Sequence, residues 1–115
     1  SFEWDDTGCQ SDCSWFGFKI TIKEDAHFTR TELAAHLDKN KIGNRMLFGG
    51  NWVRQPAFVQ LRHDEPGAMR VSGELPEADR IMNQTMFLGT YPGLTVAMID
   101  HMVEVICKFV EAKAD

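Results

Sequence analysis

The chain has 115 residues, of which 43% are apolar, 25% charged and 10% aromatic, and its formal net charge at pH 7 is −5. This length fits one domain, and the composition excludes a collagen-like or intrinsically disordered chain. The acidic balance argues against nucleic acid as a partner, and no apolar run approaches the roughly 20 residues that a membrane-spanning helix needs. We therefore expect one folded, cytoplasmic domain that binds neither nucleic acid nor a membrane.

Residues 1–14 are predicted to form an extended arm or linker, because they are mostly polar. Cys9 and Cys13 lie in this segment, and the third cysteine, Cys107, lies in a helical pattern. An odd number of cysteines favours a reduced cytoplasmic protein. A bridge or a metal contact at Cys9 and Cys13 is a minor alternative, since no second pair completes a four-ligand site. Because the chain begins at Ser1 without Met, we expect a piece of a longer protein.

The first predicted element is a strand at 15–23, where apolar and polar residues alternate. Its buried face is predicted to consist of Phe16, Phe18, Ile20 and Ile22. Thr29 followed by Glu32 is the capping-box pattern, which predicts a helix that begins at about Arg30. Asn40 is typical of a helix end and indicates where this helix stops.

The middle of the chain is predicted to contain a short strand and then irregular structure. The strand spans 45–48 and ends at a pair of glycines. Segment 51–58, interrupted by Pro56, is predicted to be a loop or a short turn of helix. Segment 59–69 is predicted to be a surface loop, because it contains the turn signal Pro66-Gly67.

The last third of the chain is predicted to form a helix, a strand and a helix. The first helix begins at Pro76 and runs to about Thr85, because proline and acidic residues favour a first turn. A strand follows at 86–89, and the last helix spans 96–112. The buried stripe of this helix is predicted to comprise Met98, Met102, Ile106 and either Phe109 or Val110. Alternating strands and helices of this kind predict an α+β two-layer sandwich.

No complete catalytic set stands out in the sequence. The four histidines follow no metal-ligand spacing, and neither a nucleophile elbow nor a dinucleotide-binding glycine motif occurs. Arginines in apolar, glycine-bearing segments are candidates for binding phosphate or carboxylate groups. These candidates, with nearby amides, are Arg45, Asn51, Arg54, Gln55, Arg80 and Asn83. The alternative for each arginine is an ion pair with the excess acids of this chain.

Five segments in fixed order carry a resemblance to a known family. They are 15–22 (WFGFKITI), 41–51 (KIGNRMLFGGN), 54–56 (RQP), 79–85 (DRIMNQT) and 89–95 (GTYPGLT). Together they resemble the C-terminal end of the PLP-dependent sugar aminotransferase-like (DegT/StrS) family. Within that family they most resemble the branch of CDP-4-keto-6-deoxyglucose 3-dehydrases of lipopolysaccharide biosynthesis.

The resemblance implies that residues 15–115 are the C-terminal small domain of a fold type I enzyme. The full-length enzyme would use PLP or PMP and a 2Fe-2S iron–sulfur cluster, and would act on a nucleotide sugar as a homodimer. Its large domain, with the catalytic base and the cluster cysteines, would lie upstream of Ser1. The 115 residues alone are therefore expected to bind no cofactor or metal and to be catalytically inert.

The resemblance also implies site residues where the motifs match. Phe16 and Arg80 are expected to face the active site, and Asn51 and Arg54 to contribute to the sugar-nucleotide pocket. A flat aromatic wall and guanidinium groups suit a ring and a diphosphate. Ala57 stands where relatives often have Tyr, which leaves the sugar and the nucleotide open.

Two alternatives remain at this level. The parent enzyme is a sugar-nucleotide aminotransferase, or the chain is a free-standing, non-catalytic module that binds a small ligand. The sequence upstream would separate them: a His in place of the Schiff-base Lys, with a cysteine cluster, favours the dehydrase. A Lys favours the aminotransferase, and a start codon next to Ser1 favours the module.

Overall fold

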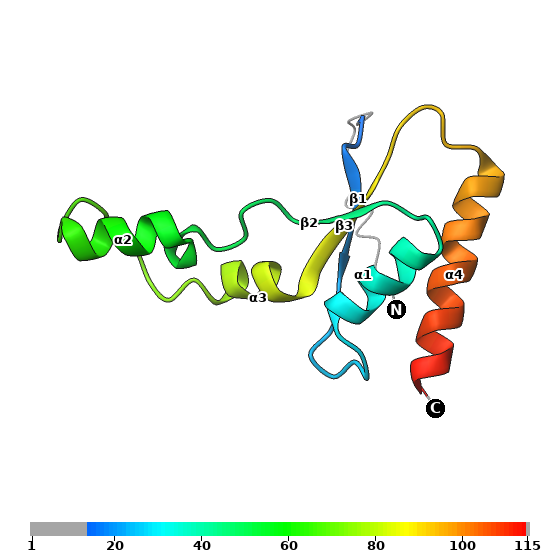
Figure 1. Cartoon of the computed structure of the whole chain (residues 1–115), viewed down its shortest axis with the longest axis horizontal. Coiled ribbons are helices and arrows are strands. Elements are labelled where there is room, and N and C mark those ends of the chain that lie inside the picture. Colours follow the sequence, from blue (N-terminus) through cyan, green and yellow to red (C-terminus); the bar gives the residue numbers. More distant parts are fainter. Residues whose placement is uncertain (1–13, 115) are drawn as a thin grey trace, which may run out of the picture.

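The structure is a computed structural model that describes residues 14–114. The predicted arm at 1–14, with Cys9 and Cys13, lies outside the described residues apart from Ser14. The elements in chain order are β1 (Gly17–Thr21), α1 (Arg30–Lys39), β2 (Asn44–Met46), the single-turn 3-10 helix η1 (Trp52–Arg54), α2 (Pro56–Asp64), α3 (Pro76–Gln84), β3 (Thr85–Gly89) and α4 (Val96–Ala114) (Figure 1).

The three strands form one antiparallel sheet in the order β1-β3-β2, so β3 is the central strand. Ile20 of β1 lies opposite Met86 of β3, and both face the hydrophobic core. Alternate residues of a strand point to opposite faces. Lys19, its partner Phe87 and Arg45 on the other side of Phe87 therefore share the second face of the sheet.

Helices α1 and α4 cover the first face of the sheet, and the core lies between them and the strands. Leu33 and Leu37 of α1 are almost completely buried there. Phe109 of α4 packs edge-on against Phe28, with ring centroids 5.1 Å apart. Burial of this apolar surface is the main force that holds the two layers together. The predicted α+β two-layer architecture is thus confirmed.

Helix α1 begins as the capping-box pattern predicts. The Thr29 hydroxyl accepts a hydrogen bond from the Glu32 amide at 3.2 Å, and the Glu32 carboxylate accepts one from the Thr29 amide at 2.8 Å. Glu32 also pairs with Lys113 of α4 at 2.8 Å. These bonds, first that from Lys113 and then those from Thr29, lower the pKa of Glu32 to about 2.

Helix α2 corrects the prediction of a surface loop for 59–64, whereas 65–69 form a turn outside the helices and strands, as predicted. Pro56 occupies the first helical position, where a backbone N–H has no partner within the helix, so the N–H that proline lacks is not needed. None of the residues of α2 is buried, so the helix has no buried stripe within this part of the chain. Figure 1 shows α2 projecting away from the sheet and from α1 and α4. The single turn η1 agrees with the predicted short turn in 51–58.

The predicted buried face of the first strand is only half right. Ile20 and Ile22 are buried, whereas Phe16 is 71% exposed and Phe18 is 41% exposed. The helices pack over the end of the sheet that carries the two isoleucines. Phe16 precedes β1, and its ring contacts Phe87 on the opposite face. The alternating sequence therefore indicates the two faces of the strand. It does not indicate how many residues of one face the helices cover.

Helix α4 extends two residues beyond its predicted end, and Thr95 caps it by accepting a hydrogen bond from the Met98 amide at 3.3 Å. Phe109 and Val105 are its buried residues, so Val105 was missed and Val110 was the wrong alternative. Met98, at the first turn, is also exposed, because the first turns of α4 extend beyond the core. Among residues 14–114, no helix is long and apolar enough to cross a membrane.

Candidate functional site

The loop between β2 and α2 carries two of the predicted site residues and bends sharply before them. Phe48 and Gly50 both have left-handed backbone conformations, with φ of 48° and 60°. The Phe48 amide donates to the Met46 carbonyl at 2.9 Å, which ends β2 two residues before the predicted boundary. A Cβ on Gly50 would lie 2.6 Å from Cγ of Met82, so only glycine fits between this loop and α3.

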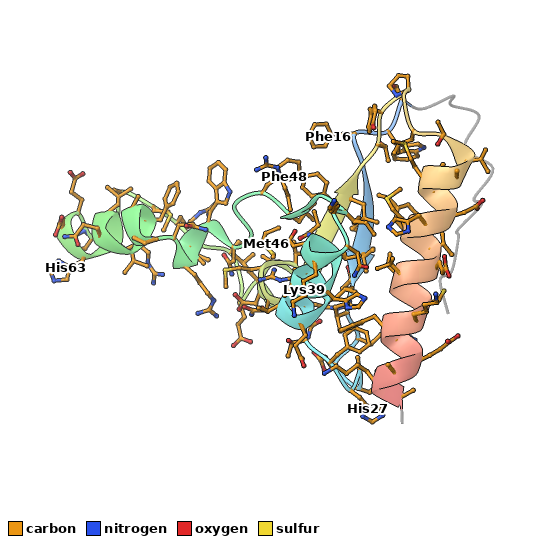
Figure 2. The ribbon with its side chains drawn as sticks, turned by 45° about the vertical axis from the view of Figure 1, so that its right-hand side comes forward. Phe16, His27, Lys39, Met46, Phe48 and His63 are labelled. Carbon is orange, nitrogen blue, oxygen red and sulfur yellow. The ribbon has the colours of Figure 1, made fainter. Side chains whose placement is uncertain are left out.

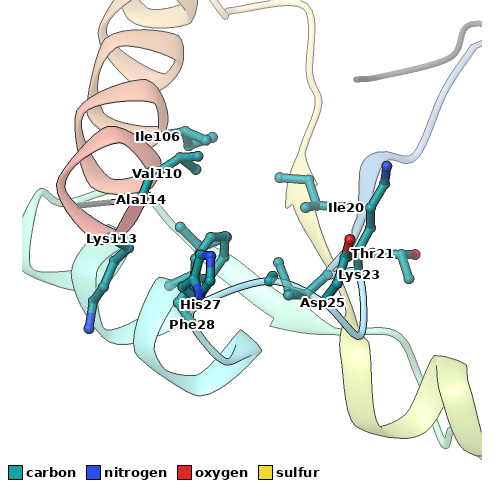
Figure 3. Close-up of a pocket in the computed structure, with 13 residues that line it drawn as sticks. Ile20, Thr21, Lys23, Asp25, His27, Phe28, Ile106, Val110, Lys113 and Ala114 are labelled. Carbon is teal, nitrogen blue, oxygen red and sulfur yellow. The ribbon is translucent and has the colours of Figure 1, made fainter.

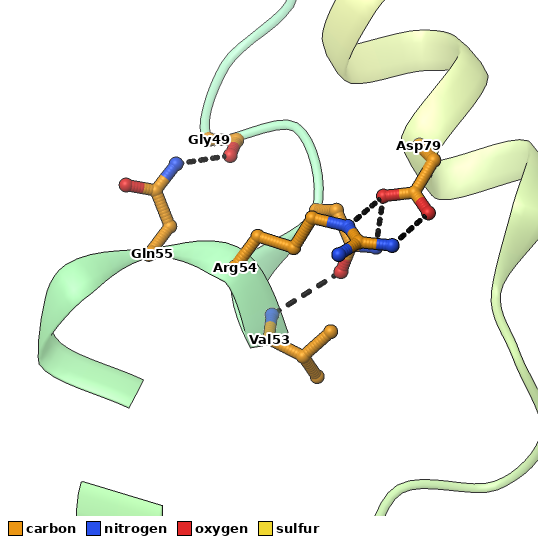
Figure 4. Close-up of polar contacts among 6 residues, drawn as sticks. Gly49, Val53, Arg54, Gln55 and Asp79 are labelled. Carbon is orange, nitrogen blue, oxygen red and sulfur yellow. Dashed lines mark hydrogen bonds and ion pairs between the residues drawn. The ribbon is translucent and has the colours of Figure 1, made fainter. Parts of the chain in front are cut away.

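Asn51 and Arg54 meet on one carboxylate, that of Asp79 in α3 (Figure 4). Asn51 is 2% exposed, and its Nδ2 donates to Oδ1 of Asp79 at 2.8 Å. Nη2 of Arg54 donates to Oδ2 of Asp79 at 2.6 Å, and Nε of Arg54 donates to Oδ1. The Asn51 Oδ1 accepts a hydrogen bond from the Val53 amide at 3.2 Å, which caps η1.

The electrostatics of this contact keep Asp79 ionised. The hydrogen bonds from Arg54, and then that from Asn51, lower the pKa of Asp79 to about 2. The same pairing raises the pKa of Arg54. Because two donors of the Arg54 guanidinium are bound to Asp79, this arginine serves mainly to hold the loop against α3. From the sequence alone, Asp79 is predicted only to be one of the acidic residues that favour the first turn of a helix.

Gln55 closes the same loop from the other side. Its Nε2 donates to the Gly49 carbonyl at 2.6 Å (Figure 4). The exposed ring of Trp52 stacks on Phe58 of α2, with ring centroids 5.5 Å apart and an interplanar angle of 25°. Asn51 and Arg54 thus tie the loop to α3, and the ring of Trp52 packs it against α2.

Phe16 lies in an aromatic cluster on the second face of the sheet (Figure 2). Its ring centroid is 5.6 Å from that of Phe87 and 6.1 Å from that of Phe48, and Phe48 is 5.8 Å from Phe87. Phe87 is buried beneath the other two, whereas Phe48 is 75% exposed. A Cβ on Gly17 would lie 2.5 Å from the Phe87 ring, so this glycine leaves room for the cluster.

A hollow of about 250 Å³ opens beside these rings. Its lining residues are Trp15, Phe16, Gly17, Lys19, Leu47, Phe48 and Phe87. Phe16 is the only one of the four predicted site residues among them. Phe48, Phe87 and Lys19 were not selected from the sequence, since their proximity depends on the register between the strands and on the bend at Phe48.

Arg80 follows Asp79 in α3 but does not join the contact with Asn51 and Arg54. Its Nη1 donates to the carboxylate of Glu77 at 3.3 Å, and about half of its side chain is exposed. Both Arg54 and Arg80 therefore pair with acids of this chain. Such ion pairs are the alternative to ligand binding that the acidic composition predicts for the arginines. Arg80 retains donors that a further anionic group could use.

A second hollow, of about 340 Å³, lies between the C-terminal turns of α4 and the connection from β1 to α1 (Figure 3). Its walls are mainly apolar and include Ile106 and Val110 of α4. It contains none of the four predicted site residues. Lys113 at its rim is engaged by Glu32. Among residues 14–114, no cluster of His, Cys, Asp and Glu has the arrangement of a metal site.

Comparison with known families decides the classification of the chain. The model of the DegT/DnrJ/EryC1/StrS aminotransferase family matches residues 3–107. The chain belongs to this family. The resemblance identified from the five sequence motifs is therefore confirmed.

Two relatives share about half of their aligned residues with this member of the DegT family. The lipopolysaccharide biosynthesis protein RfbH of Salmonella typhimurium is 51% identical over 94 residues, or 82% of this chain and 20% of the relative. The dTDP-4-dehydro-2,6-dideoxy-D-glucose 3-dehydratase of Saccharopolyspora spinosa is 48% identical over 100 residues, or 87% of this chain and 20% of the relative. The chain thus spans about a fifth of the length of these relatives.

Solved structures support the fold. A GDP-4-keto-6-deoxymannose-3-dehydratase with bound GDP-perosamine superposes with a TM-score of 0.67 at 23% identity, covering 78% of this chain and 22% of that one. The same type of enzyme with a trapped PLP-glutamate geminal diamine gives a TM-score of 0.61 at 26% identity, covering 79% of this chain and 22% of that one. The match confirms that this DegT-family chain has the fold of one part of a fold type I PLP enzyme.

Proposed function

We propose that residues 15–115 are the C-terminal small domain of a PLP-dependent nucleotide-sugar 3-dehydratase that makes deoxysugars for lipopolysaccharide. The observation that carries this proposal is the high identity to RfbH and to a 3-dehydratase over more than four-fifths of this chain but only a fifth of theirs. Within such an enzyme the domain supplies walls of the substrate pocket and is inert alone.

The exposed apolar side chains of the domain support a role inside a larger assembly. Phe16 and Phe48 are exposed on the second face of the sheet. Trp52 and Val59 are exposed on η1 and α2, the part of the domain that projects from the sheet in Figure 1. Exposed apolar groups gathered in this way are typical of surfaces that another domain or subunit covers. The large domain and the second subunit of a homodimer are the partners that we propose for them.

The described residues do not form a complete cradle for the cofactor. The Arg54 guanidinium is engaged by Asp79, and Arg80 lies exposed beside Glu77. A site for PLP or PMP needs enclosed donors for its phosphate and a group at its reactive carbon. We therefore assign the cofactor, and the 2Fe-2S iron–sulfur cluster of this branch, to the remaining part of a cytoplasmic enzyme.

The four site residues take two different roles in this proposal. Phe16 is a wall of the pocket, and Arg80 offers its free guanidinium donors to an anionic group of the substrate. Asn51 and Arg54 are positioning residues, because their bonds to Asp79 fix the loop that carries Phe48. The loop in turn places Phe48 against Phe16.

An assay of the full-length enzyme tests the proposal. The enzyme is incubated with PMP, glutamate, a reductant and CDP-, dTDP- or GDP-linked 4-keto-6-deoxy sugars, and the products are analysed by mass spectrometry. Loss of the hydroxyl at carbon 3 from one of these substrates is the expected result. Transfer of an amino group from glutamate without that loss would instead identify a sugar aminotransferase.

A further inference from the structure

Two cationic residues flank the aromatic cluster on the second face of the sheet. Lys19 of β1 and Arg45 of β2 both lie opposite Phe87 of the central strand, one on each side of it. Neighbouring strands are about 4.8 Å apart, so the two backbones are roughly 10 Å apart across Phe87. The long side chains of lysine and arginine can converge on one ligand over that distance.

Both cations are exposed and available. Within the part of the chain that the structure describes, no ion pair includes Lys19 or Arg45, although the whole chain has seventeen acids against twelve lysines and arginines. Arg54 and Arg80, by contrast, are paired with acids. The second face of the sheet thus carries positive charge that no acid among residues 14–114 neutralises.

The aromatic cluster lies next to this charge. Phe16 and Phe48 are stacked at an interplanar angle of 29° over the buried ring of Phe87, and Lys19 lines the hollow beside them. The left-handed backbone of Phe48 directs its ring onto the sheet. Such a conformation is uncommon for a bulky residue and often marks a functional position. Planar rings bind to exposed aromatic faces of this kind by offset stacking.

We propose that this face binds the nucleoside diphosphate part of the substrate, an inference that rests on the proposed function. Lys19 and Arg45 contact the diphosphate, and the base or sugar packs against Phe16 and Phe48. A planar ring joined to two phosphates is the chemistry that this combination of groups recognises. Lys19, Arg45 and Phe48 are then residues of the substrate pocket in addition to Phe16 and Arg80.

Titration calorimetry of the full-length enzyme tests the assignment. The probes are CDP, dTDP, GDP and inorganic pyrophosphate, and the variants are Lys19→Gln, Arg45→Gln and Phe48→Leu. Each charge substitution is expected to weaken the binding of the preferred nucleoside diphosphate and of pyrophosphate by roughly ten-fold. Phe48→Leu is expected to weaken the nucleoside diphosphate alone, because pyrophosphate has no ring to stack.

Lys39→Gln is the matched control, since Lys39 is an exposed lysine of α1, on the helical layer of the domain. It should leave the affinities unchanged. Unchanged affinity in Lys19→Gln and Arg45→Gln, with normal turnover by the unmodified enzyme, would overturn this inference and leave the proposed function intact. A lower melting temperature without a change in affinity would likewise overturn it, by showing that the cations pair with acids elsewhere in the enzyme. Failure of the unmodified enzyme to bind any of the three nucleotides would overturn both proposals.

Discussion

Arg54 and Asp79, which are 25 residues apart in the chain, form a two-point ion pair that fastens the loop before α2 to the first turn of α3. Asn51 adds a buried hydrogen bond to the same carboxylate. This contact determines where the loop runs, and the loop carries Phe48 to the aromatic cluster.

The ion pair should make the stability of the domain dependent on acidic pH. The pKa of Asp79 falls from 3.8 to about 2 on folding. A lowered pKa in the folded state stabilises the fold above the unfolded pKa, and this contribution is lost as the pH falls through the folded value. The difference in unfolding free energy between the wild type and Asp79→Asn should therefore be constant above about pH 5 and shrink from pH 4 to pH 2.

Urea unfolding of both proteins at a series of pH values measures this difference. Glu32, which titrates in the same window, is present in both proteins and cancels. Glu24→Gln, a change at an exposed carboxylate, is the control and should behave like the wild type. A difference between wild type and Asp79→Asn that does not vary between pH 5 and pH 2 would contradict the role of the ion pair.

Asn51→Ala should destabilise the domain by about 1–3 kcal/mol, because the part-buried amide of Val53 loses its acceptor and the Asp79 carboxylate loses one of its donors. Asn83→Ala, a change at an exposed asparagine of α3, should shift the unfolding free energy by less than about 0.5 kcal/mol. Chemical denaturation of the two variants provides the comparison. Equal changes in unfolding free energy for the two variants would show that the buried hydrogen bonds of Asn51 do not stabilise the domain.

Gly50→Ala should destabilise the domain by about 2–4 kcal/mol, since alanine is strained at φ 60° and its Cβ would overlap Met82. Gly43→Ala is the matched control, because nothing lies within 4 Å of the added carbon there. Thermal and urea unfolding should separate the two variants clearly. If they proved equally stable, the close approach of the loop to α3 would be refuted.

Local signals predicted the elements of the fold well. Thr29 and Glu32 are three residues apart, so the capping box that begins α1 is visible in the sequence itself. Helix α2 was missed because none of its residues is buried in the part of the chain that the structure describes, and a helix without a buried face need not carry the amphipathic pattern that predicts one. The exposure of Phe16 was missed for a related reason, since alternation does not say how far the helices extend over a sheet.

The candidate site could be predicted less completely. The motifs predicted Phe16, Asn51, Arg54 and Arg80 as site residues, and Asp79 became the partner of two of them only through folding of a distant segment. Lys19 and Arg45 were visible as residues of two strands. Lys19 and Arg45 flank Phe87 because β3 is the central strand and because of the antiparallel register of its two neighbours. Neither the strand order nor the register can be predicted from the sequence pattern alone.

Arg80→Ala should impair the full-length enzyme more than its fold. Loss of a charged hydrogen bond to the substrate costs about 1.5–3 kcal/mol, which corresponds to a roughly ten- to hundred-fold lower kcat/KM. The exposed pair with Glu77 is worth at most about 1 kcal/mol of stability. Steady-state kinetics and urea unfolding of the same variant measure the two effects.

Glu77→Gln is the control for this experiment, because it removes the same ion pair and keeps the guanidinium. It should leave kcat/KM unchanged. An unchanged kcat/KM in Arg80→Ala would show that Arg80 does not contact the substrate and that its only role is the ion pair with Glu77.

Turnover of nucleotide-linked 4-keto-6-deoxy sugars by the full-length enzyme and by the purified 115-residue chain, each with PMP and a reductant, tests the proposed function most directly. Loss of the hydroxyl at carbon 3 is expected with the full-length enzyme and no turnover with the 115 residues alone, because in the proposed enzyme Phe16, Arg80 and the loop supply only walls of the pocket. Reproducible turnover by the 115-residue chain, or none by the full-length enzyme, would refute the proposed function.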